Sequence, residues 1–344
     1  MHTMGQLPLL EVPRDPGTPS MDRLPKAFSP SRLKEFIQCP QLFYYKSVLG
    51  LPTPPSVHAA VGTLAHSALE LIFDHPPDQR TEDLAVSFVR PSWRAIIAPV
   101  VERSSVPEDS VEAEVRAARK AFRDMVEPGG RQEERALRSA DEYRSICEPS
   151  SQDEEDMLAR AEQMVRNWFS MEDPGNFTPE GRELHVKAPA FGVLFHGYID
   201  RIDTWERSDG ARRWAISDYK TGKVPGQGKT YSAATMARIE DEAFFAMKIY
   251  ALLWREMRGI QVNLLRLVYL STADREHGVK RLHVTERMLD ATKSQLRSLW
   301  NSIESAAKRE NFPPRPGPLC PYCAFQSICP AQKGDKPVPA ATGS

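Results

Sequence analysis

Two short segments that end in charged residues constrain the fold of this chain most. Side chains alternate from residue 193 to 204, which predicts a strand with Asp200 on one face. The second segment begins apolar and ends in Asp218-Tyr219-Lys220, so Asp218 and Lys220 share a face and Tyr219 points the other way. Carboxylates from two neighbouring strands beside an ammonium group form a place for a divalent metal ion and a water, because hard cations prefer carboxylate oxygens.

A predicted helix lies upstream of these strands. Apolar residues recur with helical spacing over residues 61–74, where Gly62, His66 and Glu70 follow one another at intervals that place them on one face. A single helical histidine is more often a packed or solvated group than a ligand, and an Asp-x-Lys pair at a strand end is more often a surface ion pair. The residues alone therefore leave a structural and a catalytic interpretation open.

These segments together resemble the RecB-like branch of the PD-(D/E)XK nuclease superfamily. The family's motifs occur in the family's order, as Gly-Thr-Leu-Ala-His at 62–66, Gly-Tyr-Ile-Asp at 197–200 and Asp-Tyr-Lys-Thr at 218–221. With the cysteines described below, the resemblance covers residues 29–330, which is most of the chain. It implies an α/β fold of the restriction-endonuclease-like type, with a central mixed sheet flanked by helices and a helical insertion.

The resemblance also implies a role for each site residue. Asp200 and Asp218 would hold Mg²⁺ or Mn²⁺, with His66 and the main-chain carbonyl of Tyr219 completing the set of ligands. Lys220 would orient a water and offset the charge that develops in the transition state. The expected catalytic residues are therefore His66, Asp200, Asp218 and Lys220.

Two nearby charged residues receive simpler interpretations. Glu183 is expected to be an ordinary edge-strand residue rather than a metal ligand. Arg201 is expected to form a salt bridge with Asp203 rather than to contact a phosphate.

A predicted buried helix over residues 242–254 departs from the RecB-like pattern. That pattern carries a glutamine four residues before a tyrosine, and here Ala246 stands in the glutamine position before Tyr250. The family's polar contact is missing, which predicts weaker positioning of the substrate.

Four of the five cysteines form a candidate metal or cluster site. Cys320, Cys323 and Cys329 lie in one short turn-rich segment, and a tetrahedral or cubane site needs a fourth ligand. Cys39, nearly the full chain away, is the candidate for that fourth ligand. Cys147 has no Cys or His nearby in the sequence and is expected to take no part.

The distant-plus-three arrangement of these cysteines resembles iron–sulfur nucleases of the AddB type and CRISPR-associated RecB-like exonucleases. The resemblance implies a [4Fe–4S] cluster. Zinc is the alternative, although zinc sites usually contain two Cys-x₂-Cys pairs and this segment has one. Either group would tie the two ends of the chain together and close a very long loop.

Length and composition set the organisation that we expect. The chain has 344 residues, of which 41% are hydrophobic and 26% charged, as in a soluble globular protein. We expect a nuclease domain over 28–330, with a helical insertion at 81–170 and the cysteine cluster at 320–330, between a disordered lead at 1–27 and a disordered tail at 331–344. The sequence has no apolar run of membrane-spanning length and no signal-peptide core, so we expect a cytoplasmic protein with no membrane partner.

The function that the resemblance implies is a metal-dependent DNA nuclease, a RecB-like exonuclease on single strands in DNA repair or recombination. The formal net charge of −1 neither supports nor excludes DNA as a partner. The sequence has no phosphate-binding loop of the Gly-x₄-Gly-Lys-Ser/Thr type, so any helicase would be a separate chain. Two rivals stay open, a non-catalytic DNA-binding scaffold of the same fold and a zinc-linked structural protein. Oligomeric state, digestion polarity, endo- or exonucleolytic cleavage and DNA or RNA preference are open as well.

Overall fold

The computed structural model describes residues 20–51, 53, 56–97, 151–228 and 230–332. Most of the predicted lead, the middle of the predicted insertion with Cys147, and most of the predicted tail lie outside these described residues. The chain divides into two compact units. The smaller unit comprises Met1–Pro54, Lys187–Gly197 and Asp290–Ser344, and the larger unit comprises Pro55–Val186 and Tyr198–Leu289.

The strands form a mixed six-stranded sheet in the order β1-β3-β4-β5-β6, with β2 also paired with β3. Strand β3 pairs with β1 in parallel and with β4 in antiparallel orientation, while β4 and β5 are parallel and β5 and β6 antiparallel. This confirms the predicted α/β class with a central mixed sheet. The strands are β1 (Ala27–Phe28), β2 (Gly181–Ala190), β3 (Val193–Glu206), β4 (Arg212–Lys220), β5 (Leu264–Tyr269) and β6 (Val279–His283).

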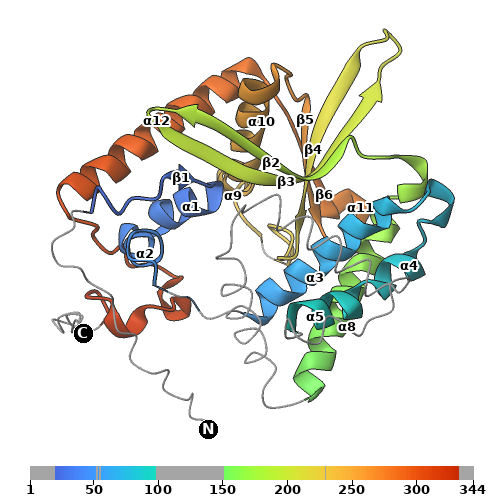
Figure 1. The fold of residues 1–344 in the computed structure, drawn as a ribbon, viewed down its shortest axis with the longest axis horizontal. Coiled ribbons are helices and arrows are strands. Elements are labelled where there is room, and N and C mark those ends of the chain that lie inside the picture. Colours follow the sequence, from blue (N-terminus) through green and yellow to red (C-terminus); the bar gives the residue numbers. More distant parts are fainter. Residues whose placement is uncertain (1–19, 52, 54–55, 98–150, 229, 333–344) are drawn as a thin grey trace. The chain divides into compact units, whose positions relative to one another are not determined.

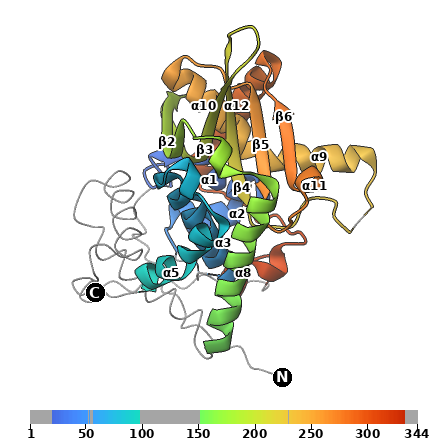
Figure 2. The same ribbon diagram turned by 90° about the vertical axis from the view of Figure 1, so that its right-hand side faces the viewer.

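In the larger unit, four helices pack together on one face of the sheet (Figures 1 and 2). They are α3 (Val57–Leu71), α4 (Glu82–Ser87), α5 (Val89–Ile97) and α8 (Ser151–Met171). Their apolar stripes share one core with side chains of β4, β5 and β6, among them Tyr219, Val268 and Val279. The described ends of the predicted insertion are thus helical and belong to this core, because α4, α5 and α8 all contribute to it.

Helix α10 (Phe245–Arg258) covers the opposite face of β4. Along β4, Trp214 and Asp218 lie on the face opposite to Tyr219, since neighbouring side chains on a strand alternate. The ring of Trp254 in α10 lies 5.8 Å from that of Trp214. α10 is buried along most of its length, as predicted, and it ends at Gly259, whose φ of +68° is the left-handed conformation common at helix ends. Among its described residues this unit also contains α9 (Ala233–Ala243) and α11 (Arg275–Gly278), and α12 (Glu286–Lys308) begins here.

The smaller unit is held by aromatic packing around α1 (Pro30–Gln38) and α2 (Pro40–Phe43). Ser29 caps α1, since its Oγ accepts a hydrogen bond from the N–H of Arg32 at 3.4 Å. Phe43 is fully buried and contacts the rings of Phe28 and Phe36. Phe43 therefore packs into the core of this unit.

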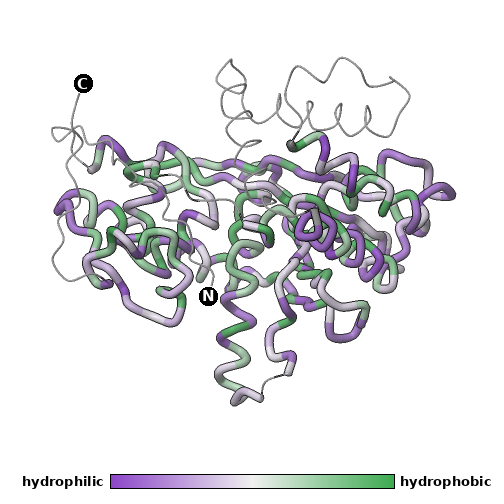
Figure 3. The backbone as a smooth tube through the Cα atoms, turned by 90° about the horizontal axis from the view of Figure 1, so that it is seen from below, coloured by the Kyte–Doolittle hydropathy of each residue, from purple (hydrophilic) through white to green (hydrophobic). Residues whose placement is uncertain are grey.

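Hydrophobic and hydrophilic residues alternate along the described elements, as expected for helices and strands with one face in a core (Figure 3). No helix among the described residues is long and apolar enough to cross a membrane.

Candidate metal centre and four-cysteine site

Strand β4 delivers the predicted carboxylate and ammonium side by side at its end. The Nζ of Lys220 lies 2.5 Å from Oδ2 of Asp218, as expected for residues two apart on a strand. Burial disfavours the charged form of Lys220, but the neighbouring Asp218 outweighs it and raises the pKa of this lysine. Lys220 is therefore a fixed cation beside a buried carboxylate.

Residues from all three motifs of the sequence meet in the larger unit. A Cβ atom added to Gly62 on α3 would lie 3.4 Å from Oγ1 of Thr221, so the first motif touches the third. The Nδ1 of His66, one turn further along α3, lies 3.5 Å from Oδ2 of Asp200 on β3. The structure thus brings together all four predicted catalytic side chains, His66, Asp200, Asp218 and Lys220.

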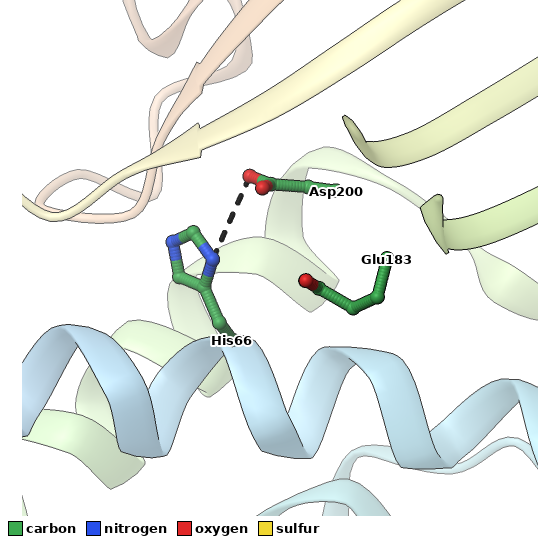
Figure 4. Close-up of side chains that lie close together, drawn as sticks. All are labelled: His66, Glu183 and Asp200. Atoms are coloured by element: carbon green, nitrogen blue, oxygen red, sulfur yellow. Dashed lines mark ion pairs between the residues drawn. The ribbon is translucent and has the colours of Figure 1, made fainter. Parts of the chain in front are cut away.

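A third ligand candidate joins His66 and Asp200. Ligand atoms of His66, Glu183 and Asp200 all lie within 4.8 Å of one another (Figure 4). These residues come from α3, β2 and β3, and their imidazole nitrogen and carboxylate oxygens suit Mn²⁺, with carboxylates also suiting Mg²⁺. Among the described residues, this is the one such group of three or more His, Cys, Asp or Glu side chains.

Glu183, interpreted from the sequence as an ordinary edge-strand residue, instead lies beside His66 and Asp200, and the sequence carries a signal for this position. β2 and β3 pair with each other, and the chain reverses between them at Phe191 and Gly192, both with positive φ. Counting equal distances from this turn along the two strands brings Glu183 opposite Asp200. The hairpin register therefore indicates a carboxylate beside the motif residue, a signal that motif matching alone does not use.

The backbone of Glu183 is strained where it presents its carboxylate. Its φ is +44°, a region that non-glycine residues seldom occupy and that recurs at functional sites. The preceding residue, Arg182, donates hydrogen bonds to the carbonyl of Glu70 at 2.5 Å and to the carboxylate of Asp74 at 2.6 Å. These contacts tie the start of β2 to α3 and hold Glu183 beside His66.

The electrostatics of the site favour a bound cation. Burial, together with the charges of Asp200, Glu70 and Asp218, raises the pKa of Glu183 to about 9. Burial also raises the pKa of Asp200 to about 6, because it outweighs the opposing effect of His66, and the charge of Asp218 raises this pKa further. Carboxylates that crowd in this way repel one another, and a divalent cation would remove that cost. The residues present therefore fit a divalent metal ion.

Tyr219 supports the site from the other face of the sheet. Its N–H donates to Oδ2 of Asp200 at 2.7 Å, and its ring meets the ring of His66 edge-on at 5.6 Å. Its hydroxyl accepts a hydrogen bond from Nη1 of Arg201 at 2.8 Å. The role of its carbonyl as a metal ligand stays a prediction.

The predicted pairing of Arg201 with Asp203 is confirmed, at 3.0 Å between Nε and Oδ2. Arg201 is only 1% exposed and also pairs with Glu172 at the end of α8, at 2.7 Å. Burial alone would raise the pKa of Glu172, but the positive charges of Arg201 and Arg266 outweigh this effect and hold the pKa at about 2. Arg201 is thus the centre of a buried ion network under β3 and β4 and is not placed to contact a phosphate.

Helix α10 brings Tyr250 towards the acidic group. Burial raises the pKa of Tyr250, and Asp218, Asp200 and Glu183 raise it further, in that order. Ala246, one turn earlier, is buried and offers no polar atom in its side chain. The tyrosine of the RecB-like pattern is thus present at the site and the glutamine is not.

In the smaller unit, the four predicted cysteines line one cavity of about 310 Å³. All four are free thiols, and burial raises the pKa of Cys323, with further contributions from Cys329, Cys39 and Cys320. No three of their sulfurs lie within 4.8 Å of one another. A tetrahedral zinc ion, with Zn–S bonds of about 2.3 Å, would hold its sulfurs about 3.8 Å apart. The four thiols around this cavity are a ligand set that either a [4Fe–4S] cluster or a zinc ion could use.

A mixed sheet with helices on both faces, which carries acidic side chains beside one lysine, is consistent with the restriction-endonuclease-like class of nucleases. The family model of the PD-(D/E)XK nuclease superfamily matches residues 27–330, and the chain belongs to this superfamily. Its members are hydrolases that use divalent metal ions to cleave nucleic acid.

Two solved structures are distantly similar. A protein from Eubacterium rectale, described as a candidate exonuclease, has 13% sequence identity and a TM-score of 0.40, with 87% of each chain covered. The protein SSO0001 has 17% identity and a TM-score of 0.31, with 62% of this chain and 94% of that chain covered. No curated protein matches the chain.

Proposed function

We propose that this protein is a metal-dependent deoxyribonuclease of the RecB-like type that digests single-stranded DNA from its ends in DNA repair or recombination. One observation carries the nuclease part: His66, Glu183 and Asp200 converge within 4.8 Å, beside the Asp218–Lys220 pair. The motif order in the sequence supports the RecB-like type, and that type in turn supports exonuclease action on single strands.

The residues divide the work between metal binding and catalysis. His66, Asp200 and Glu183 would hold Mg²⁺ or Mn²⁺, with Asp218 and the carbonyl of Tyr219 as further ligands. When bound, the ion polarises the scissile phosphate and lowers the pKa of a water. Lys220 would orient the attacking water with its ammonium group and offset the negative charge that develops on the phosphate.

The cysteines add a second group to the proposal, a [4Fe–4S] cluster bound by Cys39, Cys320, Cys323 and Cys329. The resemblance of the cysteine spacing supports a cluster over zinc, because zinc sites usually contain two Cys-x₂-Cys pairs and this segment has one. Bound there, the cluster would join the first and last parts of the smaller unit.

A second candidate function rests on Ala246. Without the glutamine of the RecB-like pattern, the fold could act as a DNA-binding scaffold with little cleavage. The intact site argues against this candidate, because Asp218 and Lys220 are paired and His66 and Asp200 are in contact.

Digestion of end-labelled DNA tests the proposed activity. Single and double strands, each labelled at either end, are incubated with Mg²⁺ or Mn²⁺, and the products are compared with those in chelator. We expect metal-dependent release of short products from single strands, with the label position giving the polarity. Cleavage of closed single-stranded circles would contradict exonuclease action. No cleavage of any DNA would favour the scaffold.

A further inference from the structure

A proline-rich segment, residues 313–318, runs beside the four-cysteine cavity in the smaller unit. Proline has no backbone N–H, so only Arg315 and Gly317 can donate main-chain hydrogen bonds from this segment. The N–H of Arg315 donates to Sγ of Cys39 at 3.3 Å, and the N–H of Gly317 donates to Sγ of Cys320 at 3.3 Å. Every main-chain donor of the segment is therefore used on a cysteine sulfur.

Further contacts fix these two donors in place. The guanidinium of Arg315 donates to the carbonyl of Ile37, next to the helix end that carries Cys39. The N–H of Cys320 returns a hydrogen bond to the carbonyl of Gly317 at 3.0 Å. The prolines on either side restrict φ, so the segment loses little freedom when it orders.

We propose that residues 313–318 form a hydrogen-bonding cap over an iron–sulfur cluster, in which the N–H groups of Arg315 and Gly317 stabilise the ligand sulfurs of Cys39 and Cys320. The inference rests on the proposed cluster. Four thiolate ligands make such a cluster anionic, and hydrogen bonds to an ionised acceptor are stronger than those between neutral groups. Reduction by one electron, supplied by dithionite, adds negative charge, so the cap favours the reduced form and raises the reduction potential.

Gly317 offers a matched pair of changes. A Cβ added there meets no atom within 4 Å, and Gly317 is not among the glycines with positive φ. Gly317→Ala therefore keeps the N–H donor and adds a methyl group in open space. Gly317→Pro removes the donor, but its ring also places a carbon atom towards Cys320. A third variant, with glycolic acid in place of Gly317, exchanges only the N–H for an oxygen.

The full-length protein, purified without oxygen, is compared in three measurements: iron content, midpoint potential by dithionite titration with electron paramagnetic resonance, and loss of visible absorbance in an iron chelator. We expect Gly317→Ala to behave as the wild type. The glycolate variant should show a more negative midpoint and lose its cluster about two- to tenfold faster, which is the scale of one hydrogen bond. Gly317→Pro should change in the same direction and at least as far.

The outcomes distinguish a failure of the proposed cap from a failure of the proposed cluster. If the wild type contains the cluster and the glycolate variant matches Gly317→Ala in both midpoint and loss rate, the cap is wrong and the cluster stands. If the wild type contains no iron, the proposed cluster is wrong and the cap falls with it. DNA cleavage is measured separately and bears on neither conclusion.

Discussion

Lys220 is the residue whose removal tests the catalytic site most directly. Lys220→Ala leaves the carboxylates in place, so the metal ion should still bind, and more tightly because a nearby positive charge has gone. Cleavage should fall by at least about a hundredfold, the scale for the loss of one preorganised electrostatic group. Binding of DNA should be largely kept, because phosphate contacts are spread over many residues. Calorimetry with Mn²⁺, a DNA-binding assay and a cleavage assay measure the three effects.

Two further variants serve as a control and as a comparison for Lys220→Ala. Lys223→Ala removes an exposed lysine just beyond the site and should cleave normally. Asp218→Ala removes an expected metal ligand, so both cleavage and metal affinity should fall. Near-normal cleavage by Lys220→Ala would reduce the Asp218–Lys220 pair to a surface ion pair, and the nuclease proposal would lose its centre.

Glu183 should make the metal-free protein less stable as the pH rises. Its pKa is raised to about 9 in the folded state, against about 4.3 in an unfolded chain. The folded state therefore holds the proton more tightly, and this stability is lost as the pH rises from the lower value through the higher one. Glu183→Gln stays neutral, so in chelator it should melt at a higher temperature than the wild type at about pH 8. Thermal unfolding across that pH range measures the difference.

Glu183→Gln should stabilise the metal-free protein but weaken metal binding. The ion has to displace the proton on Glu183, so wild-type affinity for Mn²⁺ should rise with pH and binding should release protons. Glu183→Gln should bind Mn²⁺ more weakly and release fewer protons, as calorimetry in two buffers of different ionisation enthalpy would show. Glu206→Gln, at an exposed position of β3, is the control. Unchanged affinity and stability in Glu183→Gln would exclude Glu183 from the site.

At the scale of elements, β4 carries the site on one face and its support on the other. Tyr219 links the two, since its N–H holds Asp200 and its hydroxyl accepts from Arg201. Tyr219→Phe keeps the ring and loses only the buried hydroxyl. We expect a loss of about 1.5–3 kcal/mol in the free energy of unfolding, as for a hydrogen bond to a charged group. Denaturant unfolding measures this loss, and Tyr231→Phe, at a more exposed position, is the control. Equal stability of the two variants would mean that the hydroxyl of Tyr219 contributes nothing to folding.

A substitution in helix α10 tests whether the missing glutamine affects the cleavage rate. Ala246→Gln should raise the cleavage rate without a change in metal affinity, if the lost contact positions the substrate. Ala246 is buried, so the larger side chain also has to be accommodated. Ala246→Met has a similar volume without the amide and separates the two effects. Equal rates in the Gln and Met variants would mean that the amide has no role here and that α10 has repacked around the alanine.

The elements that carry the site were the easiest to predict from the sequence. Alternation along β3 and the apolar start of β4 are local patterns, and the order of the three motifs fixes which strands meet. Glu183 and Glu172 were harder, because their importance comes from partners that are distant in the sequence. Arg201 illustrates the difference: its bond to Asp203 follows from spacing along one strand, whereas its bond to Glu172 depends on how α8 packs beneath β3.

At the scale of the whole molecule, the smaller unit is assembled from three separate parts of the chain. Its first part carries Cys39 and its last part carries the other three cysteines of the proposed cluster site. The hydroxyl of Tyr45 also donates to the carbonyl of Ile328 at 2.9 Å, which is a second contact between these two parts. Bringing them together closes a loop of most of the chain, so a group that binds all four sulfurs should stabilise the fold strongly.

Cys323→Ser tests this link. Anaerobic wild-type protein should be brown, with a broad charge-transfer band in the visible spectrum. The variant should lose iron and melt at a lower temperature, because a serine hydroxyl is a poor replacement for a thiolate ligand and the loop is no longer closed. Cys147→Ser, which changes the cysteine outside the predicted site, should alter neither property. Colourless wild-type protein with one equivalent of zinc would overturn the cluster, and a brown Cys323→Ser protein with unchanged melting would show that these cysteines are not its ligands.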